Sequence, residues 1–245
     1  MHSYLPHEFT LVEYEKLLQL AVKNFPFKTY TELNTHNRFV VWRHDVDMSL
    51  QQAVTLARIE ARQQVQATYF IHLHNDFYNA LDFAAQQLIR EIIAAGHRIG
   101  LHFDAAYYHI SSAQQLVYWL NFEKHILENL FEQKLDVFSF HNPDEFTLSF
   151  RHDHYAGMIN TYSGFFRDNV SYCSDSNGYW RYEKLLDVLN DKTISRLQVL
   201  THPEWWTEDA LMPREKAVRY AEQSGKRAIV NYDRILKAAG RVNIS

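Results

Sequence analysis

Cysteine is nearly absent from this sequence: Cys173 is the only one among 245 residues. A single cysteine excludes an intramolecular disulfide and disfavours a zinc site built from thiolates. The sequence also lacks an apolar run near the ~20 residues that cross a bilayer, so we expect no membrane span. The first residues carry neither the basic nor the apolar region of a secretory signal, and we therefore expect a cytoplasmic protein.

Charge of one sign is not concentrated anywhere along the chain. The 25 basic and 29 acidic residues give a formal net charge of −4, and no stretch is dense in Lys or Arg. Proteins that bind nucleic acid carry clustered basic residues, so we expect no nucleic acid among the partners. The sequence leaves the oligomeric state open.

Glycine and proline are also scarce, with 7 and 5 residues, and no low-complexity linker or internal repeat divides the chain. The 47% hydrophobic and 22% charged residues are typical of a folded globular protein. α/β barrels commonly reach this length as one unit. We therefore expect a single domain over residues 1–245, with a core at 39–206 and C-terminal helices at 207–239.

Short apolar runs alternate with amphipathic helical patterns, which is typical of parallel βα units. The expected strands are 39–42, 67–72, 97–102, 137–140, 172–174 and 197–201. The expected helices are 10–24, 49–64, 80–95, 111–133 and 207–239, the last with a break near Ser224 and Gly225. Residues 144–170 are expected to be irregular. This order predicts an α/β fold with a parallel sheet or barrel.

Ionisable side chains follow the ends of these expected strands. They are Asp45, Asp47, His102, His141, Asp175 and His202. In a parallel barrel the carboxyl ends of all strands converge on one face, where active sites are built. The pattern therefore predicts a single site that gathers these side chains.

The residue types at the strand ends suit metal-assisted hydrolysis. A carboxylate and imidazoles are ligands for Zn²⁺ or another first-row divalent ion. A second carboxylate that stays off the metal is free to act as a base on water. A simpler interpretation also stays open, in which Asp45 and Asp47 only cap the following helix and His102 is an ordinary buried histidine.

Five sequence blocks in a fixed order resemble the polysaccharide deacetylase superfamily. They are Arg43-His44-Asp45-Val46-Asp47, Ala67-Thr68-Tyr69-Phe70, the run from Gly96 to His102, the run from Ser174 to Trp180, and Leu200-Thr201-His202. The resemblance covers about residues 39–206. It implies a distorted (β/α) barrel of about seven parallel strands and an activity that removes N- or O-acetyl groups from sugars.

The resemblance also implies roles for the matching residues. Asp45 corresponds to the general base, and Asp47 and His102 correspond to metal ligands. His202 corresponds to the general acid, and Asp175 to the residue that supports it.

The chain departs from the family's pattern at the second histidine ligand, where it has Ala106. Three residues are candidates for the missing ligand, namely His141, Asp104 and His109. We favour His141 because it ends a strand and can point into the site. If His141 instead takes the place of a family arginine, it orients Asp45 and does not bind metal.

The sequence therefore predicts a metal-dependent, deacetylase-like hydrolase that removes an acetyl or similar acyl group from an amino sugar. The expected cofactor is a divalent metal, zinc first, with Co, Ni and Mn as alternatives. The expected location favours a small-molecule, lipid-linked or nucleotide-linked sugar, such as a precursor of a surface polysaccharide. Two other functions stay open: a metal-free hydrolase of a cyclic amide, and a sugar-binding barrel without catalysis.

Overall fold

The computed structural model describes residues 5–35 and 38–244. Residues 1–4, the start of the segment in which we expect no secretory signal, lie outside the described residues. The strands are β1 (Phe39–Val46), β2 (Thr68–His72), β3 (Arg98–Phe103), β4 (Val137–Phe140), β5 (His154–Tyr155), β6 (Met158–Asn160), β7 (Ser171–Ser174) and β8 (Arg196–Thr201). The α-helices are α1 (Leu11–Asn24), α2 (Leu50–Arg62), α3 (Phe83–Ala94), α4 (Ala113–Phe131), α5 (Gly164–Asn169), α6 (Leu185–Asn190) and α7 (Pro213–Ala238).

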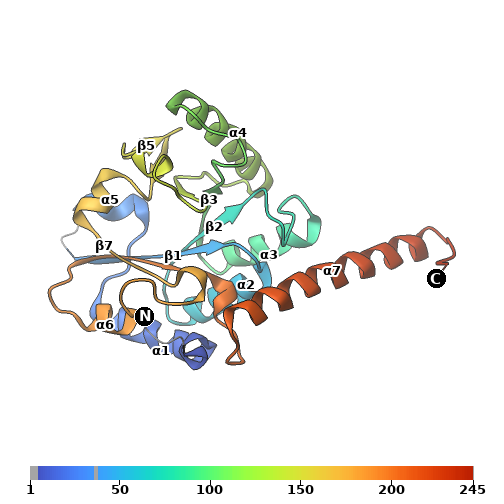
Figure 1. The fold of residues 1–245 in the computed structure, drawn as a ribbon, viewed down its shortest axis with the longest axis horizontal. Helices are drawn as coiled ribbons and strands as arrows, with labels where there is room; N and C mark the ends of the chain where they lie inside the picture. The colour runs from blue at the N-terminus through green and yellow to red at the C-terminus, as the bar shows by residue number, and fades with distance from the viewer. Residues whose placement is uncertain (1–4, 36–37, 245) are drawn as a thin grey trace.

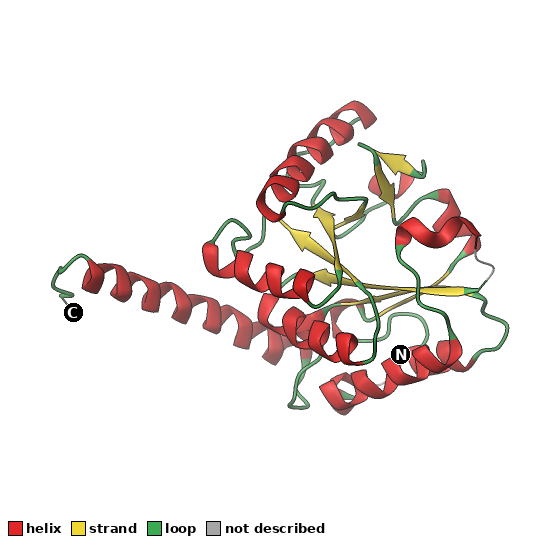
Figure 2. Cartoon of the chain, turned by 180° about the vertical axis from the view of Figure 1, so that it is seen from behind, coloured by secondary structure: helices red, strands yellow, loops and turns green. Residues whose placement is uncertain are grey.

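The strands of the described residues form one sheet in the order β5-β6-β4-β3-β2-β1-β8-β7. Seven of them run parallel, and only β5 is antiparallel to its neighbour β6. The sheet curls into an open half-barrel with helices around its outside (Figures 1 and 2). The expected α/β fold, a distorted barrel with about seven parallel strands, is confirmed.

The helices begin where their sequence signals predict. The side chains of Thr10, Ser49 and Ser112 each accept a hydrogen bond from the backbone N–H three residues further on, and so cap α1, α2 and α4. Helix α3 ends just before Gly96, whose φ of +96° lies in the region that favours glycine. Local capping chemistry therefore determines these boundaries.

Side chains of β1 alternate between the two faces of the sheet, and this alternation positions the functional residues. Trp42 and Val46 belong to the main core between sheet and helices. Val41 belongs to a second apolar cluster, on the opposite, inner face. Because strand residues two apart share a face, Arg43 and Asp45 continue the inner face towards the carboxyl end of the strand.

A buried hydrogen-bond network on the outer face fixes the end of β1. Glu60 of α2 accepts hydrogen bonds from the hydroxyls of Tyr14 and Tyr69, and lies 2.6 Å from Nε2 of His44. The other ring nitrogen of His44 lies 2.8 Å from the hydroxyl of Thr201 on β8. Burial by itself raises the pKa of Glu60, but the charge and hydrogen bond of His44, together with the charge of His97 and the hydrogen bond of Tyr14, outweigh burial and lower it. The network thus ties helix α2 to strands β1, β2 and β8 directly beneath the strand ends.

The expectation that residues 144–170 are irregular is wrong. Strands β5 and β6 and helix α5 lie in this segment. Strand β6 extends the sheet beside β4, with Ile159 in register with Val137. Strands of two or three residues are too short to show a period, and they form here because the edge of β4 offers them hydrogen-bonding partners.

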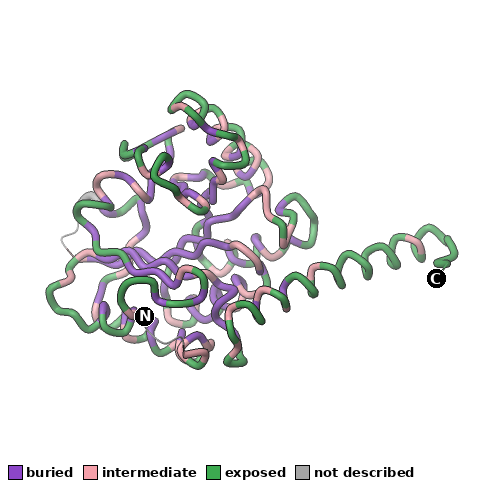
Figure 3. Tube along the Cα trace, viewed as in Figure 1, coloured by how far each residue is buried: buried purple, intermediate pink, exposed green. Residues whose placement is uncertain are grey.

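The C-terminal helix differs from its expected form. Instead of several helices over 207–239 with a break near Ser224 and Gly225, the chain forms the single helix α7. Glycine costs only about 1 kcal/mol in a helix and keeps its N–H donor, so it does not have to interrupt one. Much of α7 extends away from the half-barrel as an exposed rod (Figure 3). None of the described helices has the length and apolar character needed to cross a membrane.

Candidate active site

A cavity of about 630 Å³ opens at the carboxyl ends of the strands. The predicted site residues that line it are Asp45, Asp47, His102, His141 and His202. Asp175 is fully buried next to His202. The structure therefore brings all six residues together, as expected for strand ends that converge on one face. Their chemical roles remain predictions.

Asp45 is held by Arg43, a partner that the sequence pattern had not identified. Nη2 of Arg43 lies 2.8 and 2.6 Å from the two carboxylate oxygens of Asp45, and both side chains are almost completely buried. Burial by itself raises the pKa of Asp45, but the charge and hydrogen bond of Arg43, together with the charges of His102 and His202, outweigh burial and hold it below the usual value. Asp45 is therefore an ionised carboxylate. Arg43 thus pairs with Asp45, which is the role that the sequence had also allowed for His141.

Replacing Arg43 with Met is expected to destabilise the protein by about 3–5 kcal/mol, because it leaves the buried Asp45 carboxylate without a counter-charge. Urea unfolding of the parent, Arg43→Met, Asp45→Asn and the double variant measures the coupling between the two residues. We expect the double variant to be more stable than the sum of the single losses predicts. Strictly additive losses would show that Arg43 does not act through Asp45.

Three ligand-type atoms form a compact triangle at the centre of the cavity. Nε2 of His102 lies 3.1 Å from Oδ1 of Asp47 and 3.1 Å from Nδ1 of His141, and the third edge, from His141 to Asp47, is 3.5 Å. A tetrahedral ion with bonds of 2.0–2.1 Å separates its ligand atoms by about 3.3 Å. The triangle therefore has the dimensions of one face of a tetrahedral metal site.

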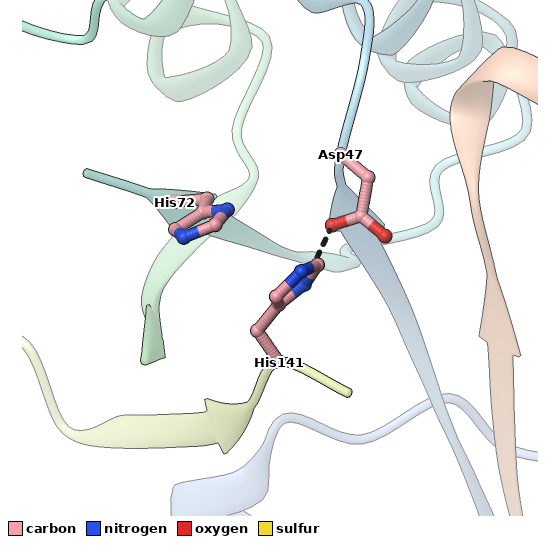
Figure 4. Close-up of side chains that lie close together, drawn as sticks. All are labelled: Asp47, His72 and His141. Atoms are coloured by element: carbon pink, nitrogen blue, oxygen red, sulfur yellow. Dashed lines mark ion pairs between the residues drawn. The ribbon is translucent and has the colours of Figure 1, made fainter. Parts of the chain in front are cut away.

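His72 stands beside this triangle. It ends β2 in register with His102 on β3, and one ligand atom each from Asp47, His72 and His141 lie within 4.8 Å of one another (Figure 4). Burial and the nearby charges of His102 and His141 lower the pKa of His72 to about 3, so its imidazole is neutral. Its buried Nε2 makes no hydrogen bond to any residue that the structure describes. The sequence signal that could have identified His72 is its place at a strand end.

Of the other two candidates for the missing ligand, Asp104 lies at the edge of this group, with its Oδ2 4.0 Å from Nε2 of His72. Oδ1 of Asp104 accepts hydrogen bonds from the backbone N–H groups of Ala106 and Tyr107 and so stabilises a turn. His109 is exposed and adopts a left-handed backbone conformation with φ of +51°. Of the three candidates, only His141 lies against both Asp47 and His102.

His202 is oriented by a buried carboxylate. Its Nδ1 lies 2.7 Å from Oδ1 of Asp175, and Trp206 donates to the second oxygen at 2.8 Å. Trp180, from the block that resembles the family, packs against Trp206, with their ring centroids 5.9 Å apart. Burial by itself lowers the pKa of His202, but the hydrogen bond and charge of Asp175, together with the charges of Asp47 and Glu204, outweigh burial and raise it to about 10. The imidazole is therefore protonated at neutral pH, which is the form a general acid requires.

The walls of the cavity combine many charged and polar side chains with several aromatic rings. The rings that line it include Phe77, Phe140, Tyr162, Tyr172, Tyr182 and Trp205. Arg181, which lies over the ring of Tyr182, is a basic side chain at the same surface. Aromatic side chains beside placed polar groups also occur in sites for small organic ligands.

Comparisons with known proteins found similarity only among solved structures. No protein-family model matches the chain, and no curated protein matches its sequence. A CE4 esterase from Streptococcus mutans is 15% identical, with a TM-score of 0.47, over 90% of this chain and 92% of that chain. A chitin deacetylase from Colletotrichum lindemuthianum is 14% identical, with a TM-score of 0.46, over 78% of this chain and 84% of that chain.

A CE4 family pseudoenzyme from Bacillus anthracis is also similar, with 15% identity and a TM-score of 0.44, over 77% of this chain. The chain spans less than two thirds, 62%, of the length of that protein.

Proposed function

We propose that this chain is a divalent-metal-dependent hydrolase that removes an acetyl or similar acyl group from an amino sugar. The observation that carries the proposal is the grouping of three elements in one cavity. These are the ionised Asp45, the triangle formed by Asp47, His102 and His141, and the protonated His202. Base, metal ligands and acid are what hydrolysis of an amide or ester needs.

The residues present fit a divalent ion. No described residue makes a hydrogen bond to the buried Oδ1 of Asp47, although two imidazole nitrogens face it. A carboxylate with histidines is a donor set for zinc. Asp47, His102 and His141 would hold the ion, with His72 beside them. When bound, it supplies a Lewis acid that polarises an acyl carbonyl and makes a water molecule more acidic.

The side chains divide the proton transfers between them. Asp45 accepts a proton from the water whose oxygen attacks the carbonyl carbon, and Arg43 keeps Asp45 ionised for this purpose. As the bond from that carbon to the sugar nitrogen or oxygen breaks, His202 donates its proton to the leaving atom. The products are a carboxylic acid and a free amine or alcohol. Asp175 stabilises the imidazolium of His202 before the transfer.

The cavity dimensions support a small sugar as the group that is bound. Its volume of about 630 Å³ is within the range of small-molecule sites, and aromatic side chains line it. A free, lipid-linked or nucleotide-linked amino sugar presents one such ring to the site, with any carrier outside the cavity. In this arrangement the sugar nitrogen or oxygen that carries the acyl group lies near the carboxyl ends of the strands.

Metal removal tests the proposal. Chelator-treated protein is expected to lose acetate release from an N-acetylated amino sugar, and stoichiometric Zn²⁺, Co²⁺, Ni²⁺ or Mn²⁺ should restore it. Asp47→Ala should prevent the restoration, whereas Asp76→Ala, the same substitution at an exposed position of the cavity, should permit it. Full activity of metal-free protein would instead favour a metal-free amide hydrolase. Sugar binding without acetate release from the metal-loaded protein would favour a non-catalytic barrel.

A further inference from the structure

One wall of the active-site cavity differs from the others in its charge. It belongs to the loop after β7, the last strand of the sheet, and its lining residues are Ser176, Asn177, Arg181 and Tyr182. The carboxylates that line the cavity come from other segments: Asp45, Asp47, Asp76, Asp104 and Glu204. Among the described lining residues, Arg181 is the only lysine or arginine. Its positive charge is therefore set apart from the acids, on one side of the cavity.

The hydrogen-bond donors on this wall have no partner within the protein. No residue that the structure describes forms an ion pair or a side-chain hydrogen bond with Arg181 or with the side chain of Asn177. The guanidinium carbon of Arg181 lies 5.6 Å from the centre of the Tyr182 ring. Packing over a ring holds the planar guanidinium and leaves its N–H groups free to bind a carboxylate or phosphate with two hydrogen bonds. Both side chains can therefore donate to a ligand in the cavity.

The backbone that carries these donors is firmly held. The N–H of Arg181 donates to the carbonyl of Ser174 at 3.3 Å, and the preceding Trp180 is buried with its ring 5.4 Å from that of Phe9. On the other side, Gly178 has a φ of +77°, and a Cβ there would lie 2.9 Å from Cγ of Pro213. A binding wall that is already ordered loses little conformational entropy when a ligand binds. The loop is therefore suited to recognition.

The distribution of charge indicates where on the ligand an anionic group lies. The carboxylates at the strand ends repel an anion, whereas Arg181 attracts one. Arg181 and Asn177 are both exposed, so they lie at the mouth of the cavity rather than at its base. The anion therefore belongs to the part of the ligand that points outwards. In a lipid-linked or nucleotide-linked sugar, that part is the phosphate group that joins the sugar to its carrier.

We propose that Arg181 and Asn177 bind a phosphate group carried by the sugar, which rests on the proposed function in placing an amino sugar in the cavity. The substrate class is then a sugar phosphate ester, and a neutral sugar lacks the group that these residues recognise. Arg181 acts in specificity: it donates hydrogen bonds to phosphate oxygens at the mouth, and no bond to phosphorus is made or broken. A nucleotide carrier and a lipid carrier share this chemistry.

Titration calorimetry of the full chain, as purified and after loading with Zn²⁺, tests the phosphate site. The probes are N-acetylglucosamine, its 1-phosphate and inorganic pyrophosphate. Arg181→Gln should weaken binding of the phosphorylated probes by about 10- to 100-fold, the effect of losing a hydrogen bond to a charged group, and leave binding of the neutral sugar unchanged. Asn177→Gly, which suits the φ of +58° at this position, should weaken it by about threefold to tenfold.

Arg214→Gln is the matched control. It removes the same charge from an exposed arginine at the start of α7 that does not line the cavity. It should bind all three probes as the parent does. Uridine-diphosphate-linked and farnesyl-diphosphate-linked N-acetylglucosamine then compare the two carriers, and dependence on Arg181 with either one supports the proposal.

Several outcomes would overturn the phosphate site. They are the absence of measurable binding for every phosphorylated probe, parent-like binding in Arg181→Gln, and equal losses in Arg181→Gln and Arg214→Gln. Binding of N-acetylglucosaminuronic acid that depends on Arg181, when binding of the 1-phosphate does not, would assign the arginine to a carboxylate on the sugar ring instead. Arg181-dependent phosphate binding without acetate release would support the phosphate site and count against the hydrolase, so the two proposals fail separately.

Discussion

Asp45→Asn is expected to slow hydrolysis of an acetylated sugar by about 10²- to 10⁴-fold, the range contributed by a general base. Asn has the shape of Asp45 but cannot take a proton from water at neutral pH. Metal content should be unchanged, because Asp45 lies outside the triangle of Asp47, His102 and His141. Acetate release gives the turnover, and elemental analysis of the same preparation gives the metal content.

Asp104→Asn is the matched control for this variant. Asp104 lines the same cavity, but its carboxylate stabilises a turn by accepting backbone N–H groups, and the amide oxygen of Asn can also accept them. We expect it to retain both turnover and metal. Unreduced turnover in Asp45→Asn would reject Asp45 as the base, and equal losses in both variants would point to the charge of the cavity as a whole.

His141→Asn is expected to weaken metal binding by more than the about 10- to 100-fold that follows loss of an outer-shell partner. The reason is that His141 belongs to both groups of ligand-type atoms, the triangle with His102 and the set with His72. Competition with a chromophoric chelator measures the affinity for Zn²⁺. His109→Asn is the same substitution at an exposed, left-handed position that Asn tolerates, and it should bind as the parent does.

Two further variants separate the two groups. His102→Ala should reduce affinity as strongly as His141→Asn if the triangle holds the ion, and His72→Ala should do so if the second set holds it. Parent-like affinity in His141→Asn would contradict both arrangements. A loss of Zn²⁺ affinity confined to His109→Asn would indicate that the missing ligand is His109, in the loop that contains Ala106.

Several features of the fold follow from local sequence. The caps Thr10, Ser49 and Ser112 and the terminating Gly96 determine helix ends through contacts within one turn. Long apolar runs such as β1 identify strands that are buried on both faces. Because parallel strands end on one face, the convergence of the six candidate residues could be predicted before any contact was known.

Features that depend on distant partners could not be predicted in this way. The strands β5 and β6 are defined by pairing with β4 rather than by a period of their own. Arg43 lies within the block that carries the resemblance to deacetylases, yet its pairing with Asp45 depends on both side chains turning into the half-barrel. The neutral state of His72 depends on burial and on the charges of His102 and His141, which come from other strands.

The sequence alone determined which residues can do chemistry and the face of the sheet on which they gather, because strand polarity and the period of two residues are local properties. Only the tertiary structure showed how these residues group, with Arg43 on Asp45, a triangle of ligand-type atoms from Asp47, His102 and His141, and Asp175 on His202. That grouping depends on separations of 2.6 to 3.5 Å between side chains that are up to 94 residues apart. Such separations are set by how the strands curl and pair, which no local pattern records.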